Sequence, residues 1–241
     1  MTHQEKILVV DDEADIREII SLCLRRDGYE IVEAGSAEEA LEVLDPTFSL
    51  ILLDIMMDGM NGYDLATRLR KEGNMIPIIF LTAKTTENDM LRGFGSGADD
   101  YIKKPFSTRE LSARVKSIIT RSTLPVITAA EVVQAGPLTI ETEAKTVTID
   151  GKTISLTRTE YDILMLLIKN EGRTLTRPDI LSAIWTDDKT VMERTVDVHI
   201  ARLRRKLGDY ASVVVNRVGF GYTFRPNEKK SGHEPTDRPL S

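Results

Sequence analysis

The sequence has little cysteine and no long apolar run. The single cysteine among 241 residues, Cys23, cannot form a disulfide within the chain, and its apolar neighbours predict a buried position. No stretch approaches the roughly 20 apolar residues of a membrane-spanning helix, and the richest, Leu50–Leu53 and Ile76–Leu81, have the length of strands. The first six residues lead directly into a strand pattern, so we expect no signal peptide. These absences argue against a disulfide-stabilised secreted protein and a membrane protein, and they predict a cytoplasmic location.

Basic residues are too few to give the chain a positive charge. There are 32 lysines and arginines against 38 aspartates and glutamates, a formal net charge of −6, which by itself argues against nucleic acid as a partner. The charge is uneven, however, because residues 1–124 contain 15 basic and 22 acidic residues, whereas residues 190–225 contain seven basic and three acidic residues. An acidic half and a locally basic segment indicate two domains with different partners.

The first half of the chain alternates apolar runs of strand length with segments of helical periodicity. The expected strands are Lys6–Val10, Tyr29–Ala34, Leu50–Leu53, Ile76–Thr82 and Asp100–Lys103. The expected helices are Ala14–Asp27, Ala37–Leu44, Tyr63–Lys71, Thr86–Phe94 and Thr108–Arg121. Near-continuous runs of Val, Ile and Leu between helices are typical of strands buried on both faces. We therefore predict a doubly wound α/β domain with a five-stranded parallel sheet.

The second half has a different pattern. It begins with Ser122–Ala135, which has small residues, one proline and no amphipathic repeat, and which we interpret as a linker. The expected elements beyond it are strands Leu138–Glu141, Thr146–Ile149 and Thr153–Leu156, helices Arg158–Asn170, Arg177–Trp185 and Arg194–Leu207, and a hairpin of Val213–Arg217 with Tyr222–Arg225. Residues 227–241 have the composition of a disordered tail. The expected domains are therefore 1–121 and 136–226, the second of the α+β class.

Polar side chains follow four of the five expected parallel strands. In an open parallel sheet, ligands bind outside the carboxyl ends of the strands, so we expect these side chains to meet there. They are Asp11, Asp12, Asp54, Thr82 and Lys104. Two unit charges about 4 Å apart repel by roughly 4 kcal/mol at an effective dielectric constant of 20, so three converging carboxylates predict a bound cation. Oxygen ligands alone favour Mg²⁺ or Mn²⁺.

Asp54 is the candidate nucleophile of this group, because its strand is expected near the middle of the sheet. The Thr82 hydroxyl offers a hydrogen-bond donor, and Lys104 offers a compact positive charge. A carboxylate, a divalent cation, a donor and an ammonium group are the parts needed to move a phosphoryl group and hold it. The sequence therefore predicts an aspartate that accepts a phosphoryl group.

Residues 1–121 resemble a response-regulator receiver domain. The segments that carry the resemblance are Lys6–Glu13 (KILVVDDE), Leu53–Gly62 (LDIMMDGMNG), Leu81–Ala83 (LTA) and Gly97–Phe106 (GADDYIKKPF). The resemblance implies a flavodoxin-like fold in which Asp54 receives a phosphoryl group from a sensor histidine kinase. It also implies that Asp11 and Asp12 hold Mg²⁺ together with Asp54 and the backbone carbonyl of Met56.

The same resemblance implies which residues bind the phosphoryl group and which change conformation in response. Lys104 would contact it, and the peptide bond between Lys104 and Pro105 would be cis. Thr82 and Tyr101 would form a switch in which the hydroxyl moves to the phosphoryl oxygen and the aromatic ring turns inward behind it. Such a domain is not an enzyme, although slow self-dephosphorylation is expected.

Two positions depart from the family pattern. Asp58 stands where the family usually has proline, which predicts altered rates of phosphorylation or dephosphorylation without loss of the chemistry. Met90 stands where related proteins have a basic residue that pairs with the equivalent of Glu110 across an activated dimer. Asp100 and Arg114 remain for that symmetric interface, so a homodimer is expected, with a weaker interface.

The segment 194–207 predicts a basic amphipathic helix. On a helical wheel Val196, Ile200, Leu203 and Leu207 form an apolar stripe, whereas Thr195, His199, Arg202 and Lys206 lie on another face and Arg205 lies opposite the stripe. A shorter expected helix ending at Trp185 precedes it, and a hairpin containing glycine follows it. Two helices followed by such a hairpin are typical of proteins that place the second helix in the DNA major groove.

Residues 136–226 resemble the winged-helix effector domain of the OmpR/PhoB type, through Leu156–Leu164 (LTRTEYDIL), Arg194–Leu207 (RTVDVHIARLRRKL) and Gly219–Tyr222 (GFGY). The resemblance implies DNA contacts by the polar residues of the last helix and the wing. These are Arg194, Thr195, His199, Arg202, Arg204, Arg205 and Arg217. The family often has arginine where Val218 stands, and a one-residue shift on a strand turns a side chain to the other face, so insertion of this wing into the minor groove is not expected.

The leading hypothesis is thus a response regulator whose phosphorylation promotes dimerisation and binding to promoter DNA, with RNA polymerase as a further partner and no association with a membrane. Two alternatives stay open. One is a DNA-binding protein whose receiver acts without phosphorylation. The other is a phosphohydrolase that forms an aspartyl phosphate, which is disfavoured because such enzymes commonly carry the nucleophile after the first strand.

Overall fold

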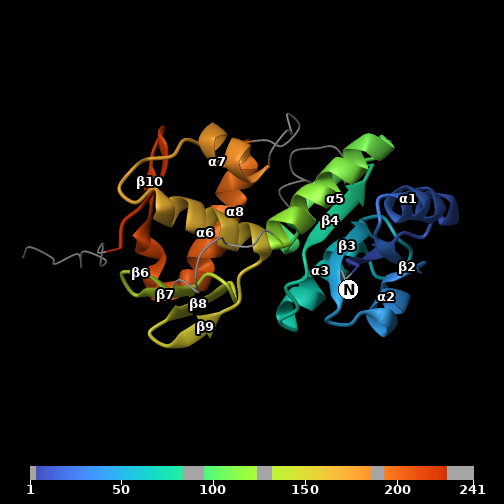
Figure 1. The fold of residues 1–241 in the computed structure, drawn as a ribbon, viewed down its shortest axis with the longest axis horizontal. Coiled ribbons are helices and arrows are strands. Elements are labelled where there is room, and N and C mark those ends of the chain that lie inside the picture. Colours follow the sequence, from blue (N-terminus) through green and yellow to red (C-terminus); the bar gives the residue numbers. More distant parts are fainter. Residues whose placement is uncertain (1–3, 84–94, 124–131, 186–192, 227–241) are drawn as a thin grey trace, which may run out of the picture.

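A computed structural model describes residues 4–83, 95–123, 132–185 and 193–226. Figure 1 shows two lobes, with the N-terminal elements on the right and the C-terminal elements on the left. Within the described residues, no helix has the length and apolar composition needed to cross a membrane. The expected helix Thr86–Phe94, the position Met90 and the expected tail 227–241 lie outside the described residues.

The N-terminal lobe is built on a parallel sheet in the order β2-β1-β3-β4-β5. Its strands are β1 (Lys6–Val10), β2 (Glu30–Ala34), β3 (Phe48–Asp54), β4 (Ile78–Thr82) and β5 (Asp100–Lys103). The described helices are α1 (Ala14–Arg26), α2 (Ala37–Val43), α3 (Gly62–Lys71) and α5 (Thr108–Thr123). The prediction of a doubly wound five-stranded parallel sheet is confirmed, and β3 lies at its centre.

Helices cover both faces of this sheet, because alternate residues of each strand point to opposite faces. Ile7 and Val9 of β1 pack in one apolar cluster with residues of α1 and α5. Leu8 and Val10 of the same strand pack in a second cluster with residues of α2 and α3. All four side chains are buried, which accounts for the uninterrupted apolar run in the sequence.

The C-terminal lobe opens with an antiparallel sheet in the order β6-β7-β8-β9. Its strands are β6 (Val132–Ala135), β7 (Leu138–Glu141), β8 (Thr146–Ile149) and β9 (Lys152–Ile154). The predicted linker was therefore too long at its C-terminal end, since Val132–Ala135 form β6. This short segment pairs with β7 across a turn at Gly136, where φ is +63° and a side chain is disfavoured.

Three α-helices, a short 3₁₀ turn and a hairpin complete this lobe. They are α6 (Arg158–Lys169), α7 (Arg177–Ile184), α8 (Glu193–Leu207), a short 3₁₀ turn (Gly208–Val213), β10 (Val214–Arg217) and β11 (Gly221–Phe224). Thr157 and Thr176 cap α6 and α7, each in a reciprocal capping box with the acidic residue three positions on. These caps satisfy backbone donors at the start of each helix and fix where the two helices begin.

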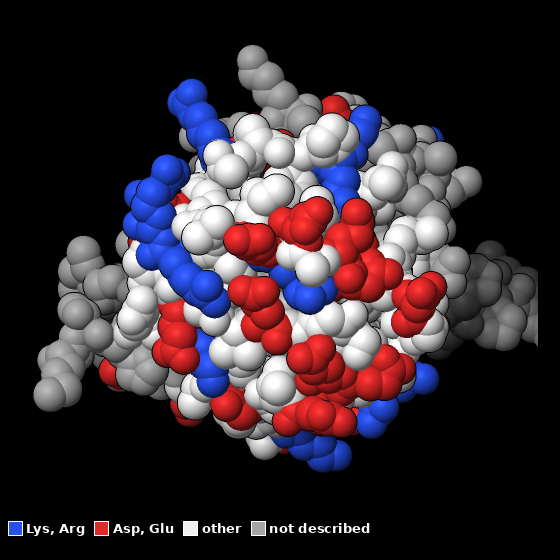
Figure 2. Space-filling view, turned by 90° about the vertical axis from the view of Figure 1, so that its right-hand side faces the viewer, with Lys and Arg blue, Asp and Glu red and all other residues white. Residues whose placement is uncertain are grey.

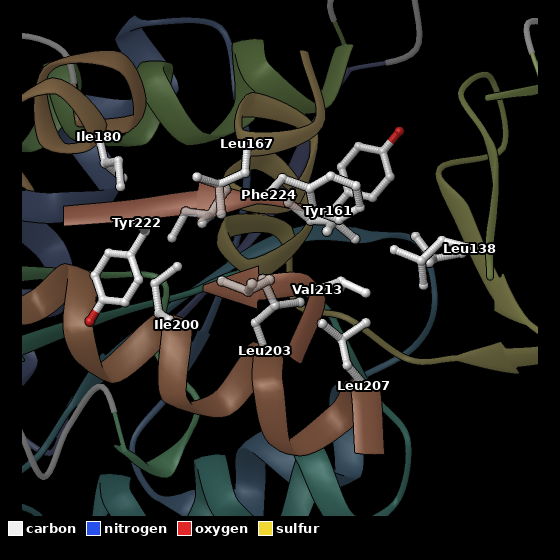
Figure 3. Close-up of a cluster of buried hydrophobic side chains, with 14 of the residues drawn as sticks. Leu138, Tyr161, Leu167, Ile180, Ile200, Leu203, Leu207, Val213, Tyr222 and Phe224 are labelled. Atoms are coloured by element: carbon white, nitrogen blue, oxygen red, sulfur yellow. The ribbon is translucent and has the colours of Figure 1, made fainter. Parts of the chain in front are cut away.

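One apolar core holds the helices of this lobe against its strands. Figure 3 shows Ile200, Leu203 and Leu207 of α8 directed toward Phe224 of β11 and Leu167 of α6. The apolar stripe predicted for residues 196–207 is confirmed as the buried side of α8, with an α+β winged-helix arrangement around it. The hairpin β10–β11 is the wing, and Val218 and Phe220 at its turn are exposed.

Candidate phosphoacceptor site and DNA-binding surface

The predicted acidic cluster forms at the carboxyl ends of β1 and β3. One carboxylate oxygen from each of Asp11, Asp12 and Asp54 lies within 4.8 Å of the others. Asp54 is only 3% exposed and Asp11 is buried, whereas Asp12 is exposed. Figure 2, which views the molecule from the right-hand side of Figure 1, shows acidic side chains gathered over this end of the protein.

Lys104 lies among these carboxylates, as expected. Its Nζ is 2.7 Å from Oδ2 of Asp11, 3.1 Å from Oδ2 of Asp54 and 3.5 Å from Oε1 of Glu13. The Lys104–Pro105 peptide bond is cis, as the resemblance implied, and the backbone N–H of Lys104 donates to the carbonyl of Thr82 at 2.7 Å. The ends of β4 and β5 are thereby tied together beside Asp54.

Burial raises the pKa of the Asp54 carboxyl above its usual value, and the nearby charge of Asp11 raises it further. Burial also raises the pKa of Asp11, although a hydrogen bond from Lys104 opposes this. Burial acts to lower the pKa of Lys104, but its hydrogen bond with Asp11 and the charges of Asp54 and Asp11 outweigh burial and raise it. The ionised carboxylates are thus held at a cost in free energy that a bound cation would relieve.

The two predicted switch residues lie behind this cluster. Thr82 ends β4 and is fully buried. Tyr101 of β5 is also buried, and its ring packs edge-on against Phe80, with ring centroids 6.3 Å apart. The ring of Tyr101 is thus covered in this structure, and the switching movement of the pair stays a prediction.

The loop after β3 holds Asp54 in place through close backbone packing. The backbone N–H of Met56 donates to the Asp54 carboxylate and acts to lower its pKa. Gly62, the first residue of α3, lies so close to Asp54 that a Cβ there would overlap the backbone carbonyl of Asp54. This role of Gly62 could not be predicted from the sequence, because nothing local shows that the start of α3 packs on the end of β3. Asp58, by contrast, is exposed.

The three residues predicted for a dimer interface contact one another within the chain. Arg114 of α5 lies 3.2 Å from Asp100 of β5 and 3.1 Å from Glu110, one turn earlier in the same helix. Arg114 and Asp100 are both buried. The structure thus brings the three together on β5 and α5, and their role in a dimer stays a prediction.

The residues predicted to contact DNA divide into two groups. Arg194 and Arg205 are exposed, and Arg204 and Arg217 are partly exposed. Thr195, His199 and Arg202 are instead buried, although a DNA-reading face was expected to be open. The helical wheel orders the faces of α8 around its axis but contains no information about which neighbours cover them.

Part of that cover comes from the same lobe. Arg202 lies 3.2 Å from Oε1 of Glu160, a fully buried acid of α6, and Lys206 lies 2.6 Å from Oε2 of the same side chain. The ring of Trp185 packs against His199, with centroids 5.4 Å apart. Trp185 therefore supports the packing of α8.

A second polar group fixes α8 to the wing. The Tyr222 hydroxyl donates to Asp197 at 2.6 Å, and the Arg177 guanidinium of α7 donates to the same carboxylate at 2.8 Å. Burial and the hydrogen bond to Asp197 raise the pKa of Tyr222 to about 12. Arg177 and Asp197 are far apart in sequence and carry no motif, so this polar group could not be predicted from the sequence.

Comparison with known families agrees with this geometry in both lobes. Residues 7–116 match the response regulator receiver domain, and residues 151–224 match the family described as transcriptional regulatory protein, C terminal. The chain is 45% identical over 222 residues to the phosphate regulon transcriptional regulatory protein PhoB of Pseudomonas aeruginosa, covering 90% of this chain and 96% of that protein. The chain belongs to the OmpR/PhoB family of response regulators.

A further relative and two solved structures are similar over nearly the whole chain. The transcriptional regulatory protein SrrA of Staphylococcus aureus is 39% identical over 240 residues, covering 95% of this chain and 98% of that protein. Among solved structures, a RitR mutant superposes with a TM-score of 0.71 at 27% identity, covering 92% of this chain and 99% of that one. DrrB of Thermotoga maritima, an OmpR/PhoB homologue, superposes with a TM-score of 0.50 at 31% identity and the same coverage.

Membership of this family establishes a receiver domain joined to a DNA-binding domain. It makes the protein a response regulator of transcription, with a kinase and DNA as its partners. The prediction of a response regulator with a winged-helix domain is thus confirmed.

Proposed function

We propose that a sensor histidine kinase phosphorylates Asp54, and that this phosphorylation controls binding of the C-terminal domain to promoter DNA. The observation that carries the proposal is the position of the Asp54 carboxylate, at the centre of the sheet's edge and 3.1 Å from Lys104. In the transfer, an Asp54 carboxylate oxygen forms a bond to phosphorus as the phosphorus–nitrogen bond of the kinase phosphohistidine breaks. The electron pair of the broken bond stays on the imidazole nitrogen.

The residues around Asp54 fit a divalent cation. Three carboxylates offer oxygen ligands within 4.8 Å of one another, a set that suits Mg²⁺ or Mn²⁺. When bound, the cation neutralises charge on the carboxylates and on the incoming phosphoryl oxygens. Asp11, Asp12 and Asp54 would hold it, together with the backbone carbonyl of Met56.

Residues in and directly after β4 and β5 then contact the phosphoryl group and change conformation in response to it. Lys104 is already among the carboxylates and pairs with a phosphoryl oxygen after transfer. The Thr82 hydroxyl moves to another phosphoryl oxygen, and Tyr101 occupies the space behind it. Water slowly hydrolyses the acyl phosphate, so the protein resets itself without acting as an enzyme on other substrates.

The output is a change of assembly and of DNA affinity. The phosphorylated receiver forms a homodimer through the surface of β5 and α5 that contains Asp100, Glu110 and Arg114. Two C-terminal domains then bind adjacent promoter sites, where RNA polymerase is the next partner. Because a regulator of transcription acts where the DNA is, we propose a cytoplasmic location. The receiver spans residues 1–121. The DNA-binding domain spans residues 136–226, and β6 (Val132–Ala135) extends it at its start.

The test is incubation with a small phosphodonor, acetyl phosphate, in the presence of Mg²⁺. We expect intact-protein mass to increase by one phosphoryl group in the wild type and not in Asp54→Asn. Asp58→Asn is the matched control, because it makes the same chemical change at an exposed acid four residues away; it should change the rate of labelling but still add one phosphoryl group. Labelling that survives Asp54→Asn would refute the assignment.

A second measurement separates the proposal from its alternatives. Rapid multiple turnover of the phosphodonor would indicate a phosphohydrolase. Equal affinity for a promoter duplex with and without phosphodonor, at fixed salt because DNA affinity depends steeply on ionic strength, would indicate a receiver that does not act as a switch.

A further inference from the structure

Asp99, directly before β5, joins the receiver to the DNA-binding domain. It is fully buried, and its Oδ2 accepts from the backbone N–H of Ile78 at 3.1 Å and lies 3.3 Å from the Arg70 guanidinium, both in the receiver. Its Oδ1 accepts from the backbone N–H of Thr159 at 3.1 Å, and its backbone carbonyl accepts from the Thr159 hydroxyl and the Trp185 indole, each at 3.4 Å. A single residue thus makes three hydrogen bonds across the domain boundary.

The contact with Thr159 completes the start of helix α6. The first backbone N–H groups of a helix have no partner within it, and the positive end of the helix dipole favours a negative charge there. Thr157 is the N-cap and accepts from the N–H of Glu160, which leaves the N–H of Thr159 to be satisfied from outside the helix. The Asp99 carboxylate supplies that acceptor, so the receiver provides part of the cap of a helix in the other domain.

The contact with Trp185 extends to helix α8. Trp185 is 4% exposed, and its ring packs against His199 in the middle of α8. One turn of the same helix also contacts the receiver directly, because Val198 packs against the apolar cluster that contains Tyr101. The face of α8 that was expected to read DNA therefore lies toward the receiver.

Charged side chains from both domains meet beside these contacts. Burial lowers the pKa of the Arg70 guanidinium despite the opposing charge of Asp99. Arg202 and Glu160, both from the DNA-binding domain, also act on this guanidinium, the first lowering and the second raising its pKa. Such effects require that the charges lie close together in a poorly hydrated region, as they do at a closely packed interface.

We propose that Asp99 is a latch that holds α8 against the receiver in the unphosphorylated protein, so that the Thr195, His199 and Arg202 face is closed to DNA. A recognition helix cannot enter the major groove while the same face packs on another domain. The latch rests on the proposed function, because phosphorylation of Asp54 is the event that releases it.

The first experiment uses Trp185, the single tryptophan of the chain, as a reporter of the latch. In the full-length protein we expect the tryptophan emission maximum to shift to longer wavelength on addition of acetyl phosphate and Mg²⁺, because the buried indole becomes hydrated. Intact-protein mass measured on the same sample reports the Asp54 adduct independently. An adduct without a shift overturns the latch and leaves the proposed function standing, whereas absence of the adduct counts against the proposed function.

The second experiment opens the latch without phosphorylation, through Thr159→Asp. An acid is favourable in the first turn of a helix, so α6 tolerates the change. The Thr159 hydroxyl already contacts Asp99, so a carboxylate in its place lies beside Asp99 and repels it. Thr153→Asp is the matched control, because it adds the same charge at an exposed position of the same domain. Asp99→Asn is a second variant that removes the charge from the receiver side.

Without phosphodonor, we expect Thr159→Asp and Asp99→Asn to show the red-shifted emission, whereas Thr153→Asp keeps the wild-type spectrum. We also expect Thr159→Asp to bind a short random-sequence DNA duplex about tenfold more tightly than Thr153→Asp at equal salt, since a lost hydrogen bond to a charged group changes an equilibrium by about that factor or more. Far-UV circular dichroism and the melting temperature show whether each variant is folded. Equal spectra and equal affinities for the folded variants would overturn the latch.

Discussion

Removal of one carboxylate from the acidic cluster should abolish stabilisation of the protein by Mg²⁺. The perturbation is Asp12→Asn, chosen because Asp12 is exposed and its replacement leaves the core intact. Two carboxylate charges at 4.8 Å, the upper limit of the separations in this cluster, repel by about 3.5 kcal/mol at an effective dielectric constant of 20. Lys104 offsets part of this repulsion, and a divalent cation would relieve the remainder.

The size of the expected effect follows from mass action. At a Mg²⁺ concentration ten times its dissociation constant, binding to the folded state alone adds about 1.4 kcal/mol to the free energy of unfolding. For a domain of this size, that gain raises the melting temperature by roughly 3–6 °C. The assay is thermal unfolding followed by circular dichroism, with NaCl adjusted so that ionic strength is equal in all samples.

The matched control is Asp15→Asn, which removes an exposed acid from the first turn of α1, outside the cluster. Wild type and Asp15→Asn should show the same Mg²⁺-dependent rise, and Asp12→Asn a much smaller one. If Mg²⁺ raises the melting temperature of Asp12→Asn as much as that of the wild type, the cation binds elsewhere and the metal site is wrong.

Three further changes test the packing around the two sites. Gly62→Ala should destabilise the receiver in urea unfolding and slow phosphorylation in the labelling assay, since its Cβ overlaps the Asp54 carbonyl. Gly35→Ala is the control, because the nearest atom to its Cβ is 3.4 Å away, and it should change neither stability nor labelling. Tyr222→Phe should lower the free energy of unfolding, measured with urea at neutral pH, by about 1.5–3 kcal/mol. The pKa of Tyr222 is raised to about 12 in the folded protein, so the wild type should lose this contribution as pH rises from the usual tyrosine pKa of about 10 toward 12. Phe224→Ala should cost about 3–5 kcal/mol, measured in the same way, because Phe224 is fully buried in the core of Figure 3.

Most of the receiver fold could be predicted because its strands are buried on both faces. Such strands appear in the sequence as uninterrupted apolar runs, and the bounds of Lys6–Val10 and Asp100–Lys103 are those of β1 and β5. Strand β6 was not predicted from the sequence, because Val132–Ala135 is short and its exposure alternates. The segment is a strand because it pairs with β7. Local sequence cannot report a strand whose stability comes from its neighbour.

The acidic cluster could be predicted for a topological reason. Parallel strands end at one edge, so residues that follow different strands meet there whatever their separation along the chain. The contacts of Asp99 with Thr159 and Trp185 follow from no such rule, because they depend on how two domains dock. The helical wheel correctly identified the core stripe of α8. It could not show that Val198, on another side of the helix, packs against the receiver domain.

Strand β5 gives the latch a physical connection to the phosphoacceptor site. Asp99 precedes the strand and Lys104 follows it, so a span of about 16 Å of extended backbone separates the contact with the DNA-binding domain from the contact with Asp54. The strand is held on one side by β4, including the bond from Lys104 to Thr82. A movement of Lys104 and Thr82 toward a phosphoryl group therefore displaces the same strand that positions Asp99. A donor–acceptor distance of about 3.6 Å is too long for a hydrogen bond. The bonds that Asp99 accepts from Thr159 and Trp185 are already 3.1–3.4 Å long, so a shift of less than ~1 Å along β5 is enough to break them.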